Sequence, residues 1–283
     1  MTYKYLYALF SDLDRTILPN GAQTESPQAR SMLAKLAQRE ELLLAYVSGR
    51  HEQLLRQAIS EYHLPLPTYA VGDVGSTIYR ISRGQWQTWS AWRDRIAPDW
   101  NGASHRDLAQ LFADMDCLKM QEDTKQNEFK LSYYAPVDCD YRTIIKEMQS
   151  RIQQQRLQCS ILWSIDEAAH TGLLDVLPAS ATKLHAVEYI MAHHDIGPDH
   201  AVFAGDSGND LPVVTSGRIP SVLVRNAHED VVTEAKQALT KKGALEQLYL
   251  AQGDFLGMNG NYSAGVVEGF IHFLPQCANW LEQ

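Results

Sequence analysis

The chain contains an apolar run, Tyr5-Leu6-Tyr7-Ala8-Leu9-Phe10, that leads directly into Ser11-Asp12-Leu13-Asp14-Arg15-Thr16. The apolar run at residues 5–10 predicts a strand that is buried on both faces. Asp12 and Asp14 follow it one residue apart, so one carboxylate can attack an electrophile while the other transfers a proton. A carboxylate attacks phosphorus well only where a metal and a cation neutralise the phosphoryl charge. On these residues alone, an acidic turn that caps the next helix is the alternative.

Composition narrows the class of protein. The chain has 283 residues, enough for one large or two smaller domains, and its net charge is -9 without a strongly basic segment. We therefore expect neither a nucleic-acid nor a membrane partner. It contains no apolar run of about 18 residues and no signal-peptide pattern at its start. The four cysteines form no C-x-x-C pair, which is typical of reduced thiols in a cytoplasmic protein.

Strands and helices alternate on the C-terminal side of this motif. Ser26-Pro27 predicts the start of a helix, and residues 42–47 form an apolar run that ends in Ser48-Gly49-Arg50. A second amphipathic helix follows, then short strands at residues 68–71 and 77–81, with Asp73 at the turn between them. This order predicts a parallel sheet with helices on its faces. Ligands bind such sheets at the carboxyl ends of the strands, where Asp12, Ser48 and Asp73 are expected.

The middle of the chain breaks the alternation. From residue 85 onward, helices are predicted near residues 108–115 and 141–157, and strands at 129–135, 160–165 and 172–177. Five of the six tryptophans lie between residues 86 and 163. We expect most of them to fill a small core and not to stack on a ligand. This segment is predicted to be an α+β module inserted into the sheet domain.

The last part resumes the first pattern. Lys183 lies in the first turn of a helix that Thr182 can cap, where a cation opposes the helix dipole. This conflict suggests a functional lysine, with a solvated surface lysine as the alternative. The same helix ends in His193-His194, for which we expect a favourable charge at a helix terminus.

A fourth core strand is predicted at residues 201–204. It ends in Gly205-Asp206-Ser207-Gly208-Asn209-Asp210, and a further strand at residues 220–224 and a helix at 229–239 follow. Acidic residues at several strand ends would repel one another at one edge of the sheet, so they require a cation between them.

These pieces together resemble the phosphatases of the haloacid dehalogenase (HAD) superfamily. Its four signatures occur in order, as Asp12-Leu13-Asp14-Arg15-Thr16, Ser48, Lys183 and Gly205-Asp206-Ser207-Gly208-Asn209-Asp210. The insertion lies between the second and third signatures, which is the place of the type-two (C2B) cap. The resemblance implies an α/β fold, a Rossmann-like parallel-sheet HAD core with an inserted α+β cap. The expected boundaries are residues 1–84 and 177–283 for the core and 85–176 for the cap.

More narrowly, the chain resembles the sucrose-phosphate phosphatases and related sugar-phosphate phosphatases. The supporting stretches are Val47-Ser48-Gly49-Arg50, Val74-Gly75-Ser76-Thr77-Ile78-Tyr79, Phe129-Lys130-Leu131-Ser132-Tyr133, Asp175-Val176-Leu177-Pro178 and Ala264-Gly265-Val266-Val267-Glu268-Gly269. They span nearly the whole chain. The chain departs from the family at Glu128, where the family often has a histidine. The identity of the sugar is therefore left open.

The resemblance implies a mechanism. Asp12 would attack phosphorus to form an aspartyl-phosphate, and Asp14 would protonate the leaving oxygen and then activate water. Mg²⁺ would be held by Asp12, the Asp14 backbone carbonyl and Asp206, and Asp210 would orient its waters or Lys183. The side chains of Ser48 and Lys183 would neutralise the phosphoryl oxygens.

The resemblance also implies contacts to the substrate. The residues expected to contact it are Thr16, Gly49, Arg50, His51, Lys130 and Asn209. Lys130 is the main candidate in the cap, with an exposed strand lysine as the alternative. His51 could instead be only a polar residue at a helix start, and Asn209 could only shape its loop.

A sugar phosphate is the expected substrate. A sucrose-phosphate-like disaccharide phosphate comes first, with mannosylfructose, glucosylglycerol or single hexose phosphates as alternatives. Two other functions stay open. The protein could be a phosphomutase that returns the phosphoryl group to sugar, or a non-catalytic regulatory partner of a sugar-phosphate synthase. We expect a cytoplasmic monomer, and a sugar-phosphate synthase is a candidate partner.

Overall fold

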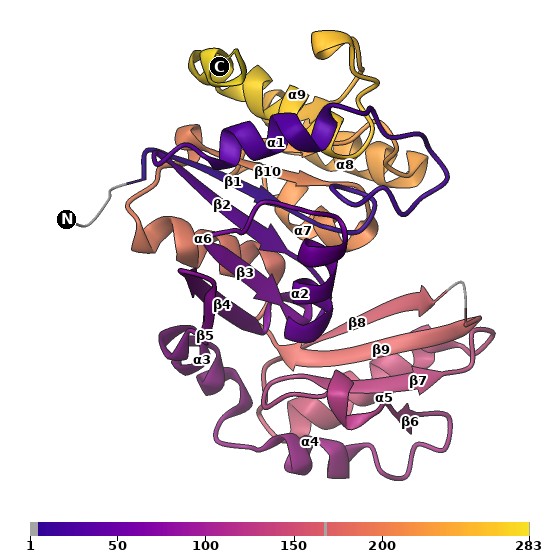
Figure 1. Cartoon of the computed structure of the whole chain (residues 1–283). Helices are drawn as coiled ribbons and strands as arrows, with labels where there is room; N and C mark the ends of the chain where they lie inside the picture. Colours follow the sequence, from indigo (N-terminus) through magenta and orange to yellow (C-terminus); the bar gives the residue numbers. More distant parts are fainter. Residues whose placement is uncertain (1–4, 167–168, 283) are drawn as a thin grey trace. The chain divides into compact units, whose positions relative to one another are not determined.

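A computed structural model describes residues 5–166 and 169–282 of the chain (Figure 1). It divides into two compact units, which we call the core and the cap. The core consists of Met1–Thr88 with Lys183–Gln283, and the cap consists of Trp89–Thr182. Within the described residues, no helix combines the length and the apolar character needed to cross a lipid bilayer.

The described strands of the core form one sheet. Its parallel part consists of β1 (Tyr7–Ser11), β2 (Leu42–Val47), β3 (Tyr69–Gly72), β10 (Ala201–Gly205), β11 (Ser221–Leu223) and β12 (Leu248–Leu250). The antiparallel strands β4 (Thr77–Ser82) and β5 (Gln85–Thr88) extend one edge, so that the order is β12-β11-β10-β1-β2-β3-β4-β5. The predicted α/β fold with a parallel-sheet core is confirmed.

The order of the strands determines which strand ends lie side by side. β1 lies between β10 and β2, with Ser11 opposite Ala204 on one side and Tyr46 on the other. Asp12 therefore leaves the sheet between the loop that starts at Asp206 and the loop that starts at Ser48. Because all three strands run in parallel, the side chains that follow them lie together at the carboxyl end of the sheet.

Helices cover both faces of the core sheet. On one face, α1 (Ala29–Ala37), α2 (Glu52–Glu61) and α9 (Ser263–Phe273) contribute to one buried apolar cluster that also contains Leu9 and Leu44. Residues of α6 (Lys183–His193) and α7 (Leu211–Val214) are buried outside that cluster, and α8 (Glu229–Lys242) follows β11. α9 packs closely on β11 because Gly269 has no side chain; a Cβ at this position would overlap Val222.

Two local predictions in the core are wrong. Ser26-Pro27 does not start the first helix, because α1 begins at Ala29 and the hydroxyl of Ser26 accepts a hydrogen bond from the Asn259 backbone N–H at 2.9 Å. The second error concerns the end of α6. His194 is not a helix-terminal charge, because burial lowers its pKa to about 4, and its Nε2 is hydrogen-bonded to the Tyr69 hydroxyl.

The cap is an α+β unit. Its described strands are β6 (Lys119–Met120), β7 (Leu131–Ala135), β8 (Cys159–Asp166) and β9 (Thr171–Pro178), which form an antiparallel sheet in the order β6-β7-β9-β8. The helices are α3 (Ser90–Ile96), α4 (His105–Leu111) and α5 (Tyr141–Gln154). Leu108 and Met148 are buried in its interior. Trp89, Trp92 and Trp100 are buried as well, which are three of the five tryptophans for which this position was expected.

The limits of the cap in the structure differ from the expected residues 85–176. Residues 85–88 form β5, which pairs with β4 and so belongs to the core sheet. At the other end, β9 continues to Pro178, and Ser180 donates two hydrogen bonds of 2.6 Å, from its backbone N–H and its hydroxyl, to the Asp99 carboxylate. These contacts tie residues 177–182 to the cap and place Lys183 at the first position of the core that follows it.

Candidate active site

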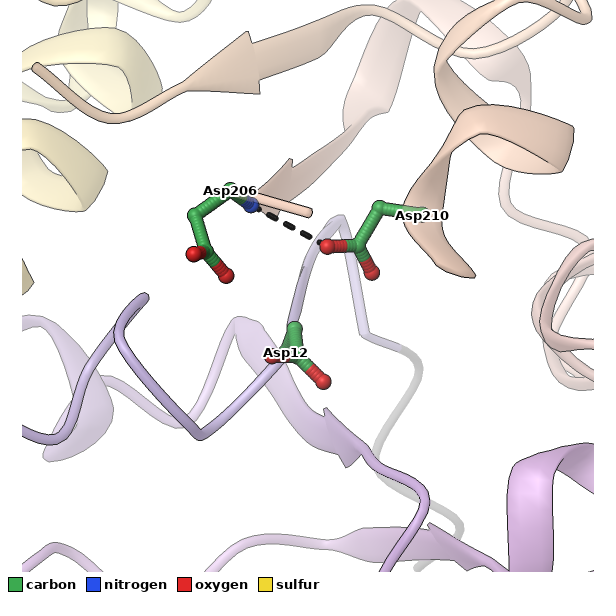
Figure 2. A group of neighbouring side chains, drawn as sticks. All are labelled: Asp12, Asp206 and Asp210. Carbon is green, nitrogen blue, oxygen red and sulfur yellow. Dashed lines mark hydrogen bonds between the residues drawn. The ribbon is translucent and has the colours of Figure 1, made fainter. Parts of the chain in front are cut away.

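Three aspartates from two strand ends meet at the carboxyl edge of the core sheet (Figure 2). Asp12 follows β1, whereas Asp206 and Asp210 lie in the loop after β10. All three side chains are buried, and one carboxylate oxygen from each lies within 4.8 Å of the other two. The predicted convergence of acidic residues thus exists, but Asp73 is not in the group: its Oδ2 accepts a hydrogen bond from the Thr77 hydroxyl at 3.2 Å.

Lys183 is the cation that faces this group. Its ammonium donates hydrogen bonds to Asp12 Oδ1 at 2.7 Å, Asp210 Oδ1 at 2.8 Å and Asn209 Oδ1 at 2.8 Å, which uses all three of its protons. Burial by itself lowers the lysine pKa, but the charges of Asp12 and Asp210 outweigh this effect and raise it. Lys183 is 2% exposed. The alternative of a solvated surface lysine is therefore wrong.

The acidic group carries more negative charge than Lys183 can balance. Burial raises the pKa of Asp12 well above its usual range, and burial together with Asp210 raises the pKa of Asp206 to about 7. Asp206 Oδ2 is buried and accepts no hydrogen bond from the described residues; the nearest cation, Arg15, has its Nε at 3.4 Å. Carboxylate oxygens that lack hydrogen-bond donors and lie close to other carboxylates are suitable ligands for a hard divalent cation such as Mg²⁺.

Asp210 shapes the loop after β10. Its Oδ2 accepts hydrogen bonds from the backbone N–H groups of Asp206 at 3.0 Å and Ser207 at 3.2 Å, while its Oδ1 accepts from Lys183. The loop needs glycine at position 205, because a Cβ there would overlap the Asp210 carboxyl group. Asp210 thereby holds Asp206 and Lys183 in place as well as contributing charge.

The residues that follow Asp14 contact Asp206. Thr16, expected at the substrate, is buried and donates its hydroxyl hydrogen to Asp206 Oδ1 at 3.0 Å. Arg15 adopts a left-handed backbone conformation with φ of 60°, which is unfavourable for a residue with a side chain. Asn226 stabilises this conformation by donating to the Arg15 carbonyl at 2.6 Å and accepting from the Tyr262 N–H at 2.8 Å.

The Asp14 side chain is not part of the acidic group. Arg50 binds it through two hydrogen bonds, from Nε to Oδ2 at 2.8 Å and from Nη2 to Oδ1 at 2.6 Å, and Asn20 donates to Oδ1 at 2.7 Å. Burial raises the pKa of Asp14, but the hydrogen bonds and charge of Arg50 outweigh it, so the pKa is lowered overall. We expected Arg50 to contact the sugar, but in this structure its guanidinium is hydrogen-bonded to Asp14.

The remaining predicted core residues differ in their contacts. Ser48 is 1% exposed, and its hydroxyl accepts a hydrogen bond from the Arg50 N–H at 3.2 Å. Gly49 lies between them, and His51 is the residue before α2, where its side chain does not cap the helix. Asn209 is exposed and, besides binding Lys183, accepts a hydrogen bond from the Ser207 hydroxyl at 3.2 Å.

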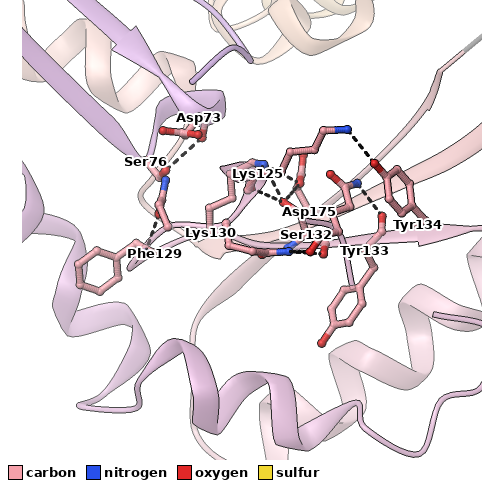
Figure 3. Close-up of polar contacts among 12 residues, drawn as sticks. Asp73, Ser76, Lys125, Phe129, Lys130, Ser132, Tyr133, Tyr134 and Asp175 are labelled. Carbon is pink, nitrogen blue, oxygen red and sulfur yellow. Dashed lines mark hydrogen bonds and ion pairs between the residues drawn. The ribbon is translucent and has the colours of Figure 1, made fainter. Parts of the chain in front are cut away.

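Lys130 lies in the cap and is buried in a polar network (Figure 3). Its ammonium donates to the Lys125 carbonyl at 3.0 Å and to Ser132 Oγ at 2.7 Å, and it lies 3.2 Å from Asp175 Oδ1. Ser132 also donates its hydroxyl hydrogen to Asp175. At 6% exposure, Lys130 is not the exposed strand lysine of the alternative interpretation. Because two hydrogen bonds and the ion pair with Asp175 already engage its ammonium, a sugar contact requires that one of these contacts be exchanged.

Sequence reasoning missed Asn20, Arg15 and Asn226. Asn20 lies in Pro19-Asn20-Gly21, which has the composition of an ordinary turn, so its sequence context hides its role. Asn226 could have been found, because it follows the strand predicted at residues 220–224 and therefore lies at the same edge of the sheet as Asp12 and Asp206.

Comparison with known proteins establishes that the chain is a HAD-superfamily hydrolase that acts on phosphoric monoesters. A family model described as sucrose-6F-phosphate phosphohydrolase matches residues 5–274, and the chain belongs to this family. A HAD-like hydrolase from Nitrosococcus oceani is 53% identical over 274 residues, which are 97% of this chain and 73% of that protein.

More distant relatives have defined names. The mannosylfructose-phosphate phosphatase of Agrobacterium fabrum is 26% identical over 270 residues, which are 95% of this chain and 98% of that protein. Among solved structures, the sucrose-phosphatase of Synechocystis sp. PCC6803, determined with sucrose and phosphate, superposes with a TM-score of 0.73 at 24% identity. The match covers 95% of this chain and 98% of that one, and it supports the shared fold.

Proposed function

We propose that the protein is a Mg²⁺-dependent phosphatase that hydrolyses a sugar phosphate through an aspartyl-phosphate on Asp12. The observation that carries this proposal is the buried group of Asp12, Asp206 and Asp210. Lys183 is bound to Asp12. The buried oxygen Asp206 Oδ2 accepts no hydrogen bond from the described residues. A buried carboxylate, a cation bound to it and an acidic site with a carboxylate oxygen that lacks a hydrogen-bond donor among the described residues thus lie together. They lie where α/β proteins bind ligands, which supports the proposal.

Asp12 is proposed as the nucleophile because it is the member of the group that belongs to the first signature and touches Lys183. Lys183 would hold the attacking carboxylate and neutralise an oxygen of the phosphoryl group, and Ser48 would donate its hydroxyl hydrogen to another. Such donors are already oriented before the substrate arrives, and each typically contributes about 3–4 kcal/mol to transition-state stabilisation.

The metal site fits the same residues. The Asp12 and Asp206 carboxylates and the Asp14 backbone carbonyl would hold Mg²⁺, and Asp210 would orient bound water or Lys183 from behind. When bound, Mg²⁺ would neutralise the phosphoryl charge that otherwise repels the nucleophile. Thr16 supports this arrangement by holding Asp206 through its hydroxyl.

Asp14 is proposed to move the proton. It would protonate the leaving sugar oxygen in the first step and then take a proton from the water that hydrolyses the aspartyl-phosphate. In the structure Arg50 and Asn20 hold the Asp14 carboxylate, which suits the second step, where an ionised base is needed. Arg50 would have to release one oxygen before Asp14 can carry the proton of the first step.

A sucrose-phosphate-like disaccharide phosphate is the substrate we propose. The family model and the named relatives support a sugar phosphate, and they leave mannosylfructose, glucosylglycerol and hexose phosphates as alternatives. Recognition of the sugar is assigned to Gly49, Arg50, His51 and Asn209 in the core and to Lys130 in the cap. For Thr16, the contact with Asp206 favours a role in supporting the metal over a direct sugar contact.

The test is phosphate release from a panel of sugar phosphates, measured with Mg²⁺ and with EDTA. We expect Mg²⁺-dependent release, fastest with one disaccharide phosphate. An isomerised sugar phosphate without release would indicate a phosphomutase, and turnover of no substrate would indicate a regulatory partner of a synthase. The position and size of the cap favour the phosphatase over the phosphomutase, which would use the same pair of aspartates. Intact Asp12, Asp14, Lys183 and Asp206 favour it over the regulatory partner.

A further inference from the structure

The side-chain amide of Asn20 binds the carboxylate of Asp14 and the backbone N–H of the next residue, Arg15. Its Nδ2 donates a hydrogen bond to the Asp14 carboxylate at Oδ1, at 2.7 Å. Its Oδ1 accepts a hydrogen bond from the backbone N–H of Arg15 at 2.8 Å, which belongs to the peptide group between Asp14 and Arg15. One planar amide therefore joins the carboxylate of Asp14 to the peptide group that contains its carbonyl.

The second contact determines the direction of the Asp14 carbonyl. In a trans peptide the N–H and C=O bonds point in opposite directions, and the backbone holds no cis peptide among the described residues. Because the Arg15 N–H points to Asn20, the Asp14 carbonyl points away from Asn20. The described hydrogen bonds of the backbone include none that ends on this oxygen, so it is available to a metal ion.

The backbone at Arg15 needs this support. With φ of 60°, Arg15 occupies the left-handed region, from which a residue with a side chain relaxes unless its neighbours hold it. Asn226 holds the carbonyl of Arg15 at 2.6 Å, and Asn20 holds its N–H. Without Asn20, the peptide group that presents the Asp14 carbonyl loses its only side-chain acceptor among the described residues.

We propose that Asn20 is a positioning residue that aligns the two functions of Asp14, its carboxyl group for proton transfer and its carbonyl for the metal. This inference rests on the proposed function, in which Asp14 has both roles. In this role Asn20 acts through its hydrogen bonds to Asp14 and Arg15 and not as a ligand of the substrate or the metal. The role predicts that the two functions can be damaged separately.

Two substitutions separate them. Asn20→Asp keeps an oxygen that can accept from the Arg15 N–H but loses the donor to Asp14, whereas Asn20→Ala loses both contacts. Gln23→Ala is the matched control, because Gln23 is an exposed amide of the same loop whose Oε1 accepts one hydrogen bond within the described part of the chain, from the Tyr262 hydroxyl at 3.3 Å. Circular dichroism and urea unfolding of each variant establish that it is folded.

Mg²⁺ binding is measured by calorimetry on the metal-free protein. The Mg²⁺ affinity depends on how the Asp14 carbonyl is placed, and the measurement requires no turnover. We expect Asn20→Ala to bind Mg²⁺ about 10-fold or more weakly, as is typical for lost partners of metal ligands. Asn20→Asp should bind Mg²⁺ at least as tightly as wild type, and Gln23→Ala should match wild type. Wild-type affinity in Asn20→Ala would overturn the metal-positioning half of the proposal.

Proton transfer is measured as kcat/KM at saturating Mg²⁺ on phenyl phosphate and p-nitrophenyl phosphate. The two substrates have similar size, but phenolate leaves poorly and depends on protonation, whereas p-nitrophenolate leaves well without it. We expect Asn20→Asp and Asn20→Ala to lose about 10-fold or more on phenyl phosphate, a part of the 10²–10⁴-fold typical of acid–base catalysis, and little on p-nitrophenyl phosphate.

The outcomes distinguish this inference from the proposed function. Equal losses on both substrates, or no loss on either, would overturn the role of Asn20 in proton transfer while wild type still hydrolyses its substrates. If wild type neither binds Mg²⁺ in calorimetry nor releases phosphate, the proposed function fails, and the role of Asn20 fails with it.

Discussion

Replacing Lys183 with methionine tests the electrostatics of the site most directly. Methionine has a similar length and volume but no charge, so Lys183→Met removes the ammonium and leaves the apolar stem. The side chain of Lys183 is 1% exposed, and those of its partners Asp12 and Asp210 are 5% and 0% exposed. Two buried carboxylates would then face each other without the cation between them.

The structure indicates the size of the effect. Removing one partner of a buried ion pair typically costs about 3–5 kcal/mol, because an uncompensated charge stays buried. In metal-free protein at pH 8 we therefore expect Lys183→Met to lower the free energy of unfolding by about 3–5 kcal/mol. The loss should be smaller at pH 5, because without Lys183 the pKa of Asp12, already raised by burial, rises further and the carboxyl group can neutralise itself by binding a proton.

Urea unfolding in EDTA measures this effect, with Asp12→Asn and the double variant as the matched set. Asp12→Asn should abolish turnover while keeping wild-type stability or better, because it relieves repulsion within the acidic group. The double variant should recover part of the stability lost in Lys183→Met but none of the activity. Such non-additivity is expected for residues in direct contact.

Two results would refute the reasoning. If Lys183→Met unfolded at the same urea concentration as wild type at pH 8, the lysine would not compensate buried charge. Activity supplies the second check, since loss of one preorganised donor typically lowers kcat by about 10²–10³-fold. A variant that keeps wild-type kcat with Mg²⁺ would remove Lys183 from the catalytic groups.

Further predictions concern the metal, the proton, the cap and pH. Activity should vanish in EDTA, and Ca²⁺ should restore it poorly because it prefers more ligands at longer distances; full activity in EDTA would exclude the metal site. Asp14→Asn should lower kcat by about 10²–10⁴-fold, and a wild-type rate would assign the proton to another group. Lys130→Met should destabilise the protein by about 1–3 kcal/mol in thermal or urea unfolding, because the buried cap network loses the two hydrogen bonds of the ammonium and its ion pair with Asp175; unchanged stability would contradict the network. His194 has a pKa lowered to about 4 by burial and by His193, so the unfolded chain binds its proton more tightly. The stability that neutral His194 contributes is therefore present above pH 6.5 and is lost as pH falls toward 4. His194→Gln, which can keep a hydrogen bond to Tyr69, should flatten this part of the unfolding-versus-pH curve, and an unchanged curve would assign the dependence elsewhere.

The architecture and the charged residues of the site could be predicted from the amino-acid sequence. Buried parallel strands are continuous apolar runs, so β1, β2 and β10 are recognisable without knowledge of their neighbours. Polar residues directly after such runs must lie at one edge of a parallel sheet, which brings Asp12 and Asp206 together. Lys183 could be predicted as a functional residue because a cation in the first turn of a helix is locally unfavourable.

The C-terminal elements gave weaker signals. β12 has only three residues, Leu248–Leu250. α9 is buried from Ser263 to Ile271, so it has no polar face and no amphipathic period from which a helix could be predicted. Its two glycines also oppose a helix locally, although Gly269 is needed for the contact with β11.

The pairing of the polar side chains, in contrast, could be read only from the folded structure. Arg50 and Asp14 are 36 residues apart, and Lys183 and Asp12 are 171 residues apart, so each pair forms only after separate strands have been brought side by side. The same side-chain chemistry would have allowed Arg50 to face a sugar and Asp73 to join the acidic group. The strength of a hydrogen bond changes when the donor–acceptor distance shifts by a few tenths of an ångström, and it also depends on the angle at the hydrogen. Periodicity and composition specify which residues are buried and at which strand end they lie, whereas the choice of partner depends on the packed structure.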